Sequence, residues 1–176
     1  MIQILIMKPF YTFILIALLS STVWSQEERL TTETTTYYFI RHAEKDRTDA
    51  TNKNPELNAL GEKRAEQWRN YFKNIDFNAV YSTSYKRTQQ TAEPTAKAKK
   101  LTIKNYDPVT LYSPEFAKET KGKRVLIVGH SDTTPAFVNM ILGRTKYNDI
   151  DDNDNSKLFI ITISGDQITD QVLSIN

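Results

Sequence analysis

Short apolar runs alternate with segments of helical periodicity along most of this chain, and that alternation limits the fold more than any other feature. Alternating strands and helices favour a mostly parallel sheet with helices on both faces, that is, a single-domain, three-layer α/β/α architecture. The apolar runs predict strands at residues 37–40, 79–81, 101–104 and 125–128, and the helical spacing predicts helices at residues 58–73, 86–99 and 134–143.

The C-terminal part predicts a hairpin. Residues 158–164 and 167–175 both have strand character, and Gly165 between them suits a tight turn. Such a hairpin would add an antiparallel strand at one edge of the sheet. The preceding helix has its own start signal, with Thr134 at the N-cap and Pro135 at the first helical position.

Composition excludes several classes of protein. A length of 176 residues suits one domain. The formal net charge is only 23 − 21 = +2, which argues against a nucleic-acid binder, since such proteins must neutralise phosphates. Without cysteine there is no disulfide framework, thiolate zinc site or cysteine nucleophile. The five glycines form neither Gly-x-Gly-x-x-Gly nor a P-loop.

Residues 1–25 predict a secretory signal peptide. A single charge at Lys8 precedes a short apolar run, and small and polar residues follow up to Ser25. An uncleaved membrane anchor is the alternative, although the run is shorter than the roughly 20 apolar residues that span a bilayer. Residues 26–36 are polar and indicate a linker, and the domain would occupy residues 37–176. We therefore expect an exported protein, periplasmic or secreted, without membrane attachment after cleavage.

The only two histidines of the chain, His42 and His130, each directly follow a predicted strand. Arg41 precedes the first, and Gly129 precedes the second, where glycine lets another group approach closely. Arg87 lies in the first turn of a predicted helix, where the helix dipole disfavours a cation unless an anion lies nearby. Ligands of such sheets bind outside the carboxyl ends of the strands, so we expect these side chains to meet at one edge.

Two arginines and two imidazoles around one concavity would form a site for a phosphate dianion. Arginine presents planar pairs of N–H donors that fit phosphate oxygens. Imidazole can donate a hydrogen bond to the phosphate or attack its phosphorus. The residues alone therefore indicate phosphate chemistry.

Three motifs follow one another along the chain: Arg41-His42-Ala43-Glu44-Lys45, Ser84-x-x-Arg87-Thr-x-x-Thr91-Ala92 and Gly129-His130-Ser131. In this order they resemble the motifs of the histidine phosphatase superfamily, which has the phosphoglycerate mutase-like fold. The resemblance extends from Tyr37 to the end of the chain. Ala43 stands where the common motif has glycine, and the resulting Arg-His-Ala-Glu form resembles a subgroup of small bacterial members.

The resemblance implies a role for each matching residue. His42 corresponds to the nucleophile that takes the phosphoryl group and becomes phosphohistidine. Arg41, Arg87 and His130 correspond to the rest of the phosphate pocket, which stabilises charge on the transferred group. No metal and no other cofactor is implied, because the arginines supply the positive charge.

The resemblance does not fix the general acid that protonates the leaving group. One branch of the superfamily takes a glutamate from a segment after the second-arginine helix, and another takes an aspartate directly after the second histidine, where this chain has Ser131. The possible general acids are Asp132 and Glu44, with Glu93 and Asp107 as weaker candidates. Asp132 is equally suited to start a helix. Some small members that resemble this chain have no obvious acid and suit substrates with good leaving groups.

The leading interpretation is an exported, metal-independent phosphoric monoester hydrolase acting on phosphomonoesters or phosphoramidates of small molecules or phosphoproteins. The alternatives are a non-catalytic phosphate-binding or interaction domain on the same fold and a phosphomutase. The segment between Ala92 and Arg124 is too short for a cap domain, so we expect an open pocket. The acidic run at residues 149–155 lacks the glycine and the final glutamate of an EF-hand loop and predicts a solvated turn, not a calcium site.

Overall fold

The computed structural model describes residues 33–175 of the chain. The predicted signal at residues 1–25 and most of the predicted linker lie outside the described residues. Within residues 33–175, no helix is long and apolar enough to cross a membrane.

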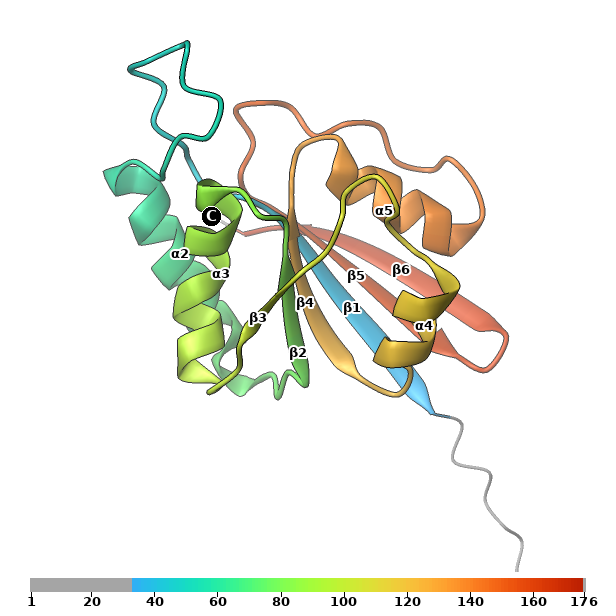
Figure 1. The fold of residues 1–176 in the computed structure, drawn as a ribbon. Coiled ribbons are helices and arrows are strands. Elements are labelled where there is room, and N and C mark those ends of the chain that lie inside the picture. Colours follow the sequence, from blue (N-terminus) through green and yellow to red (C-terminus); the bar gives the residue numbers. More distant parts are fainter. Residues whose placement is uncertain (1–32, 176) are drawn as a thin grey trace, which may run out of the picture. The chain divides into compact units, whose positions relative to one another are not determined.

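Six strands form one sheet: β1 (Thr34–Arg41), β2 (Ala79–Ser82), β3 (Ile103–Asn105), β4 (Arg124–Gly129), β5 (Lys157–Ser164) and β6 (Gln167–Ser174). Their order is β3-β2-β4-β1-β5-β6 (Figure 1). The first four in this order run parallel, whereas β5 is antiparallel to β1 and β6 is antiparallel to β5. The prediction of a mostly parallel sheet extended by a hairpin is confirmed, with β5 inside the sheet and β6 at its edge.

The helices form the two outer layers. They are α2 (Ala59–Tyr71) with the 3-10 turn η1 (Phe72–Asn74), α3 (Lys86–Ala98), α4 (Pro114–Thr120) and α5 (Thr133–Leu142). Residues of α2 and α3 pack on one face of the sheet, and residues of α4 and α5 pack on the other (Figure 1). The predicted three-layer α/β/α architecture is therefore present.

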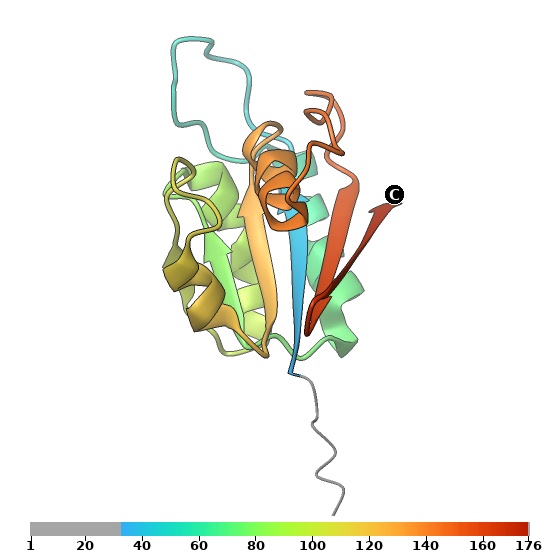
Figure 2. The same ribbon diagram turned by 90° about the vertical axis from the view of Figure 1, so that its right-hand side faces the viewer.

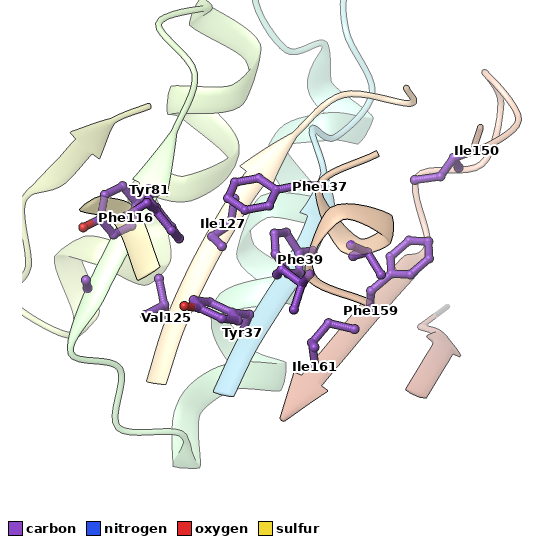
Figure 3. Packing of buried hydrophobic residues seen from close by; sticks show 13 residues of the cluster. Tyr37, Phe39, Tyr81, Phe116, Val125, Ile127, Phe137, Ile150, Phe159 and Ile161 are labelled. Atoms are coloured by element: carbon purple, nitrogen blue, oxygen red, sulfur yellow. The ribbon is translucent and has the colours of Figure 1, made fainter. Parts of the chain in front are cut away.

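Alternation of side chains along the central strands gives each face of the sheet its own core. In β4, Val125 and Ile127 face α4 and α5, whereas Leu126 and Val128 face α2 and α3. Figure 3 shows the first of these cores, in which Phe137 of α5 packs against the sheet. Each large apolar side chain removed from water in this way stabilises the fold by about 1.5–3 kcal/mol.

The sheet begins earlier than predicted. β1 starts at Thr34, so residues 34–36 belong to the sheet and not to the predicted linker. The side chain of Thr35 is buried, and the backbone N–H of Thr36 donates to the carbonyl of Lys123 at 2.9 Å. Threonine is β-branched and suits a strand even where the sequence is polar, which explains the error.

The start of α5 was also predicted wrongly. Its N-cap is Asp132, whose carboxylate accepts a hydrogen bond from the backbone N–H of Thr133 at 2.7 Å. Thr134, which the sequence placed at the N-cap, lies inside the helix with a buried side chain. The end of the helix is as predicted, because Gly143 takes the left-handed conformation with φ 64°.

The carboxyl ends of β1, β2 and β4 meet at one edge of the sheet. β1 ends at Arg41, which is in register with Gly129 at the end of β4. β2 ends at Ser82, in register with Val128 of β4. The segments that follow β1 and α5 both lie beyond this edge (Figure 2). The fold thus gathers the predicted site residues between these segments.

Candidate active site

His42 directly follows β1 and is held on several sides. Its backbone N–H donates to the carbonyl of Gly129 at 2.9 Å, and its carbonyl accepts from the Nδ2 atom of Asn155 at 2.7 Å. The ring Nδ1 lies 2.7 Å from the carbonyl oxygen of Ala43. Because a carbonyl can only accept, Nδ1 carries the proton of the neutral ring and Nε2 keeps its lone pair. This tautomer is the one that a nucleophilic Nε2 needs.

Burial keeps the imidazole of His42 neutral. The residue is only 3% exposed, and its pKa is lowered to about 3, chiefly by desolvation. The hydrogen bond to Ala43 opposes this change, and the nearby charges of Arg41 and Arg87 contribute to it. His42 is therefore neutral over most of the pH range, and the neutral imidazole is the form that can act as a nucleophile.

His130 follows β4 and its ring lies 5.5 Å from the ring of His42, centroid to centroid. The Nε2 atom is 2.9 Å from the hydroxyl of Thr83, and the Nδ1 atom is 3.4 Å from Nη2 of Arg87. Arginine only donates, so Nδ1 accepts and Nε2 donates its proton to Thr83. Burial, followed by the charge of Arg87, lowers the pKa of His130 to about 4.

Gly129 has no room for a side chain. A Cβ atom there would lie 2.7 Å from both the Thr134 hydroxyl and the Tyr106 hydroxyl, and 3.2 Å from the Thr133 hydroxyl. The glycine before His130 therefore lets α5 and the segment at Tyr106 close tightly around the turn. The sequence predicted such an approach without identifying the groups that make it.

Arg87 lies in the first turn of α3 with part of its guanidinium unpaired. The Nε and Nη1 atoms are buried and have no hydrogen-bond partner among residues 33–175. The guanidinium carbon lies 4.4 Å from the ring centre of Tyr85, and burial lowers the Arg87 pKa. Buried donors without partners are costly, so this side chain is suited to an anionic ligand.

Arg41 lies behind the site, and most of its donors are already used. The side chain is 1% exposed, and Nη2 forms an ion pair with Asp152 at 2.5 Å. Nη1 donates to the carbonyls of Asp151 at 2.8 Å and Asp154 at 3.3 Å, while Nε is buried with no partner in the described structure. The fold therefore brings Arg41 next to His42, but with Asp152 on its outer face.

Two adjoining hollows open in front of His42. The phosphate hollow, of about 390 Å³, is lined by His42, Arg87, His130 and Asp132 among others. The loop hollow, of about 440 Å³, is lined by residues of the loop after His42, Arg47 among them. Both hollows share the same three residues, His42, Lys45 and Asp152.

The candidate general acids differ in their access to these hollows. Asp132 lines the phosphate hollow while capping α5. Glu44 lines the loop hollow, but its Oε1 accepts from Nε of Arg64 at 2.7 Å. Glu93 pairs with Lys97 on α3 at 2.7 Å, and the Asp107 carboxylate accepts from the N–H of Val109 at 2.8 Å. Neither of these two weaker candidates lines the two hollows.

The acidic run at residues 149–155 contains the exposed turn that the sequence predicted, and it also forms a wall of the site. Asp152 pairs with both Arg41 and Arg47, at 2.5 and 2.9 Å. The buried Asn155 holds the backbone of His42. A buried arginine needs a counter-charge, and this requirement was the available signal. No group of three His, Asp or Glu side chains within residues 33–175 is placed to hold a metal ion.

Comparison of the fold with solved structures finds several phosphate-transfer enzymes. A protein histidine phosphatase, SixA, complexed with tungstate is 17% identical, with a TM-score of 0.63 over 79% of this chain and 96% of that chain. A phosphoserine phosphatase mutant from Entamoeba histolytica in complex with phosphoserine is 13% identical, with a TM-score of 0.61 over 78% and 95%. A phosphoglycerate mutase from Bacillus anthracis is 16% identical, with a TM-score of 0.62 over 82% and 95%. At such low sequence identities, these TM-scores show a shared fold and no more.

Two comparisons of the sequence with known proteins add to the comparison of folds. A search of curated protein sequences found no match. Residues 37–108 match the family model of the histidine phosphatase superfamily, branch 1, and this segment includes His42 and Arg87. The family model over residues 37–108, the fold and the order of the motifs all support similarity to the histidine phosphatase superfamily.

Proposed function

We propose that this protein is a metal-independent phosphatase that hydrolyses phosphomonoesters or phosphoramidates through a phosphohistidine on His42. The observation that carries the proposal is the hydrogen bond from Nδ1 of His42 to the Ala43 carbonyl, which leaves Nε2 with a lone pair beside the phosphate hollow. The unpaired donors of Arg87 and the ring of His130 lie at the same hollow. A neutral nucleophile facing cationic donors is what attack on a phosphate dianion requires.

In the first step, the Nε2 lone pair of His42 attacks phosphorus, and the bond to the leaving atom breaks with its electron pair on that atom. Arg87 donates to the oxygens of the transferred group, the ring of His130 lies beside them at the same hollow, and Arg41 lends its charge from behind. In the second step, water attacks the phosphohistidine, and the electron pair of the N–P bond returns to Nε2. Inorganic phosphate leaves and the neutral imidazole is restored.

The shape of the site supports the proposed substrate class. The two hollows are joined at His42, so a phosphoryl group can sit in one while its carrier extends over the other. Solved structures with this fold include enzymes named for phosphohistidine and phosphoserine substrates, which supports small or protein-borne phosphates. Export by residues 1–25 remains part of the proposal and is tested by sequencing the N-terminus of the protein recovered outside the cytoplasm.

The first test is hydrolysis of p-nitrophenyl phosphate by the purified protein in the presence of a chelator, with His42→Ala beside the wild type. We expect turnover by the wild type and none by the variant. Incubation with a ³²P-labelled phosphomonoester should give an acid-labile, base-stable phosphoprotein only when His42 is present. Equal turnover by both proteins would refute the assignment of His42.

Two other outcomes identify the alternatives. A wild type that binds phosphate but hydrolyses neither phosphohistidine nor phosphorylated small molecules would be a binding domain. Transfer of the label to a second organic hydroxyl in preference to water would identify a phosphomutase.

A further inference from the structure

The proposed reaction needs a proton for the leaving atom, and the two candidate carboxylates are poorly suited to supply it. The Oε1 atom of Glu44 already accepts from Arg64. The Oδ1 atom of Asp132 accepts from the backbone N–H of Thr133 at the start of α5. One oxygen of each carboxylate accepts in these contacts, and the second oxygen of Glu44 is buried without a partner within residues 33–175, whereas the leaving atom requires a donor that reaches the substrate.

The geometry points to Lys45 as the catalytic residue that donates this proton; the inference rests on the proposed phosphatase activity. Lys45 lines both hollows, as only His42 and Asp152 also do. It therefore stands where the carrier of the phosphoryl group must pass from one hollow into the other. A general acid has to lie at this boundary, because the breaking bond joins the phosphorus to its carrier.

The backbone around Lys45 is fixed. The residue forms an isolated antiparallel bridge with Leu57, and the N–H of the next residue, Asp46, donates to the carbonyl of Glu56 at 2.8 Å. The carbonyl of Lys45 accepts a hydrogen bond from Nδ2 of Asn58 at 3.4 Å. The segment that carries Lys45 is thus tied to the start of α2, and the side chain leaves it from a defined point beside His42.

The ammonium group of Lys45 is available for a substrate. Within residues 33–175 it makes no ion pair and no side-chain hydrogen bond, whereas Arg41 and Arg47 are both paired with Asp152. Lys45 is partly buried, and desolvation lowers its pKa. The charges of Arg47, Arg87 and Arg41 lower it further, and Asp152 opposes them. An ammonium group among other cations gives up a proton more readily than a solvated lysine.

The proton balance closes over the two steps. When the bond from phosphorus to the leaving oxygen or nitrogen breaks, its electron pair takes a proton from the Lys45 ammonium, which becomes a neutral amine. In the second step the attacking water gives one proton to that amine as its oxygen bonds to phosphorus. Each turnover consumes one water and returns Lys45 to its charged form, with hydrogen phosphate and the protonated leaving group as products.

The test compares leaving groups of different basicity in Lys45→Met and Lys45→Arg, with Lys53→Met as a control from the same loop. For an alkyl phosphate, whose leaving oxygen needs a proton, Lys45→Met should lose about 100-fold or more in kcat/KM. For p-nitrophenyl phosphate, whose leaving group departs as a stable anion, the loss should stay below about fivefold. Lys45→Arg should behave like Lys45→Met, because arginine keeps the charge but does not release its proton.

A loss that is equal for all leaving groups, or rescue of alkyl phosphate hydrolysis by Lys45→Arg, would overturn the inference and make Lys45 a phosphate contact only. A leaving-group-dependent loss in Asp132→Asn, absent from Lys45→Met, would move the role to Asp132. Thermal unfolding of each variant checks that it folds. The proposed function fails separately, if the wild type itself shows no turnover or if His42→Ala retains it.

Discussion

At the scale of single residues, the chemistry depends on which ring nitrogen of each histidine holds a proton. The carbonyl of Ala43 fixes the proton of His42 on Nδ1, and the hydroxyl of Thr83 accepts the proton of His130 from Nε2. Each ring therefore has one unprotonated nitrogen: Nε2 of His42, which is the proposed nucleophile, and Nδ1 of His130, which lies next to Arg87. The sequence could not predict either hydrogen bond, because a backbone carbonyl at Ala43 and a hydroxyl at Thr83 form no recognisable sequence pattern.

The low pKa of His42 makes a prediction about activity. Because its pKa in the free enzyme is about 3, the ring should stay neutral and nucleophilic well below pH 6.5. The pH profile of kcat/KM, corrected for ionisation of the substrate, should show no loss near pH 6.5 on the acid side. An acid limb at that ordinary histidine value would contradict the buried, neutral ring.

Thr83 should act as a positioning residue for His130. Thr83→Val keeps the volume but removes the hydroxyl, which accepts from His130 and also lies 2.9 Å from the Thr88 hydroxyl. Loss of the hydrogen bond to His130, worth about 1.4 kcal/mol, predicts about a tenfold drop in kcat. Thr83→Ser should restore kcat, with KM nearly unchanged in both variants. Thr95→Val is a matched control, since Thr95 is equally buried and its hydroxyl has no partner in the described chain. An equal loss in the control would show a packing effect.

At the scale of elements, the site depends on how closely α2 approaches the segment after β1. A Cβ atom on Gly61 would lie 2.2 Å from the backbone carbonyl oxygen of Glu44, two residues after His42. Backbone atoms cannot move aside as a side chain can. This glycine therefore sets the distance between α2 and the segment that carries His42.

Gly61→Ala tests this packing. Alanine favours a helix over glycine by about 1 kcal/mol, but forcing a methyl group against backbone costs about 1–3 kcal/mol or more, so we expect a net loss of stability. Activity should fall as well, because Glu44 and His42 would shift together. Urea unfolding and kcat measure the two effects, with exposed Lys63→Ala as the control. A more stable, fully active variant would refute the close approach.

The charge of Asp152, in the loop at residues 149–155, leads to a second prediction at the scale of elements. Asp152 places a carboxylate between Arg41 and the phosphate hollow, where it opposes a dianion. Asp152→Asn keeps the shape and removes the charge, so inorganic phosphate should inhibit about fivefold more strongly, as expected for one partly exposed charge. Asp151→Asn is the control, because Arg41 uses only the backbone carbonyl of that residue. Weaker inhibition would mean that Asp152 mainly holds Arg41 in place.

The sequence predicted the long elements well and failed where the signal was short. Val125 to Val128 predicted β4, and Gly165 predicted the final hairpin. α4 was missed because it has only seven residues, of which Phe116 and Thr120 alone are buried, too few to show a period. Its cap at Ser113, whose hydroxyl accepts from the N–H of Phe116 at 3.2 Å, was the readable signal.

For the site, the sequence placed the four predicted residues at one edge of the sheet, because strand ends are readable from apolar runs. It could not show that Asp152 reaches Arg41, since that contact joins residues 111 apart in the sequence. Side-chain pairings of this kind depend on loop paths that no local pattern encodes.

At the scale of the whole molecule, the buried histidines should make stability depend on pH. The folded-state pKa values of His42 and His130, about 3 and 4, lie below the unfolded value of 6.5. As pH falls below 6.5, the unfolded chain takes up protons that the folded chain does not, so the free energy of unfolding falls. The decrease is at most about 1.4 kcal/mol per pH unit for each histidine.

Urea unfolding at pH 7 and pH 5 measures this loss. A His42→Asn/His130→Asn variant should lose less stability than the wild type between the two pH values, because only the carboxylates then titrate. Inorganic phosphate should reduce the loss in the wild type, since a bound dianion favours the charged rings. Equal losses in both proteins would show that the histidines are not buried as neutral groups.

The position of β1 in the sheet has a consequence for how the chain matures. β1 is made first among the strands, yet its neighbours are β4 and β5, and Thr34 lies beside Ser164 across 130 residues of sequence. Contacts so distant are slow to form, because a long loop must close before they are made. During translation His42 therefore has no strand partners until residue 124 has appeared and no Asn155 to hold its carbonyl until later still. The proposed nucleophile is thus one of the earliest residues of the domain to be synthesised and one of the last to reach its final surroundings.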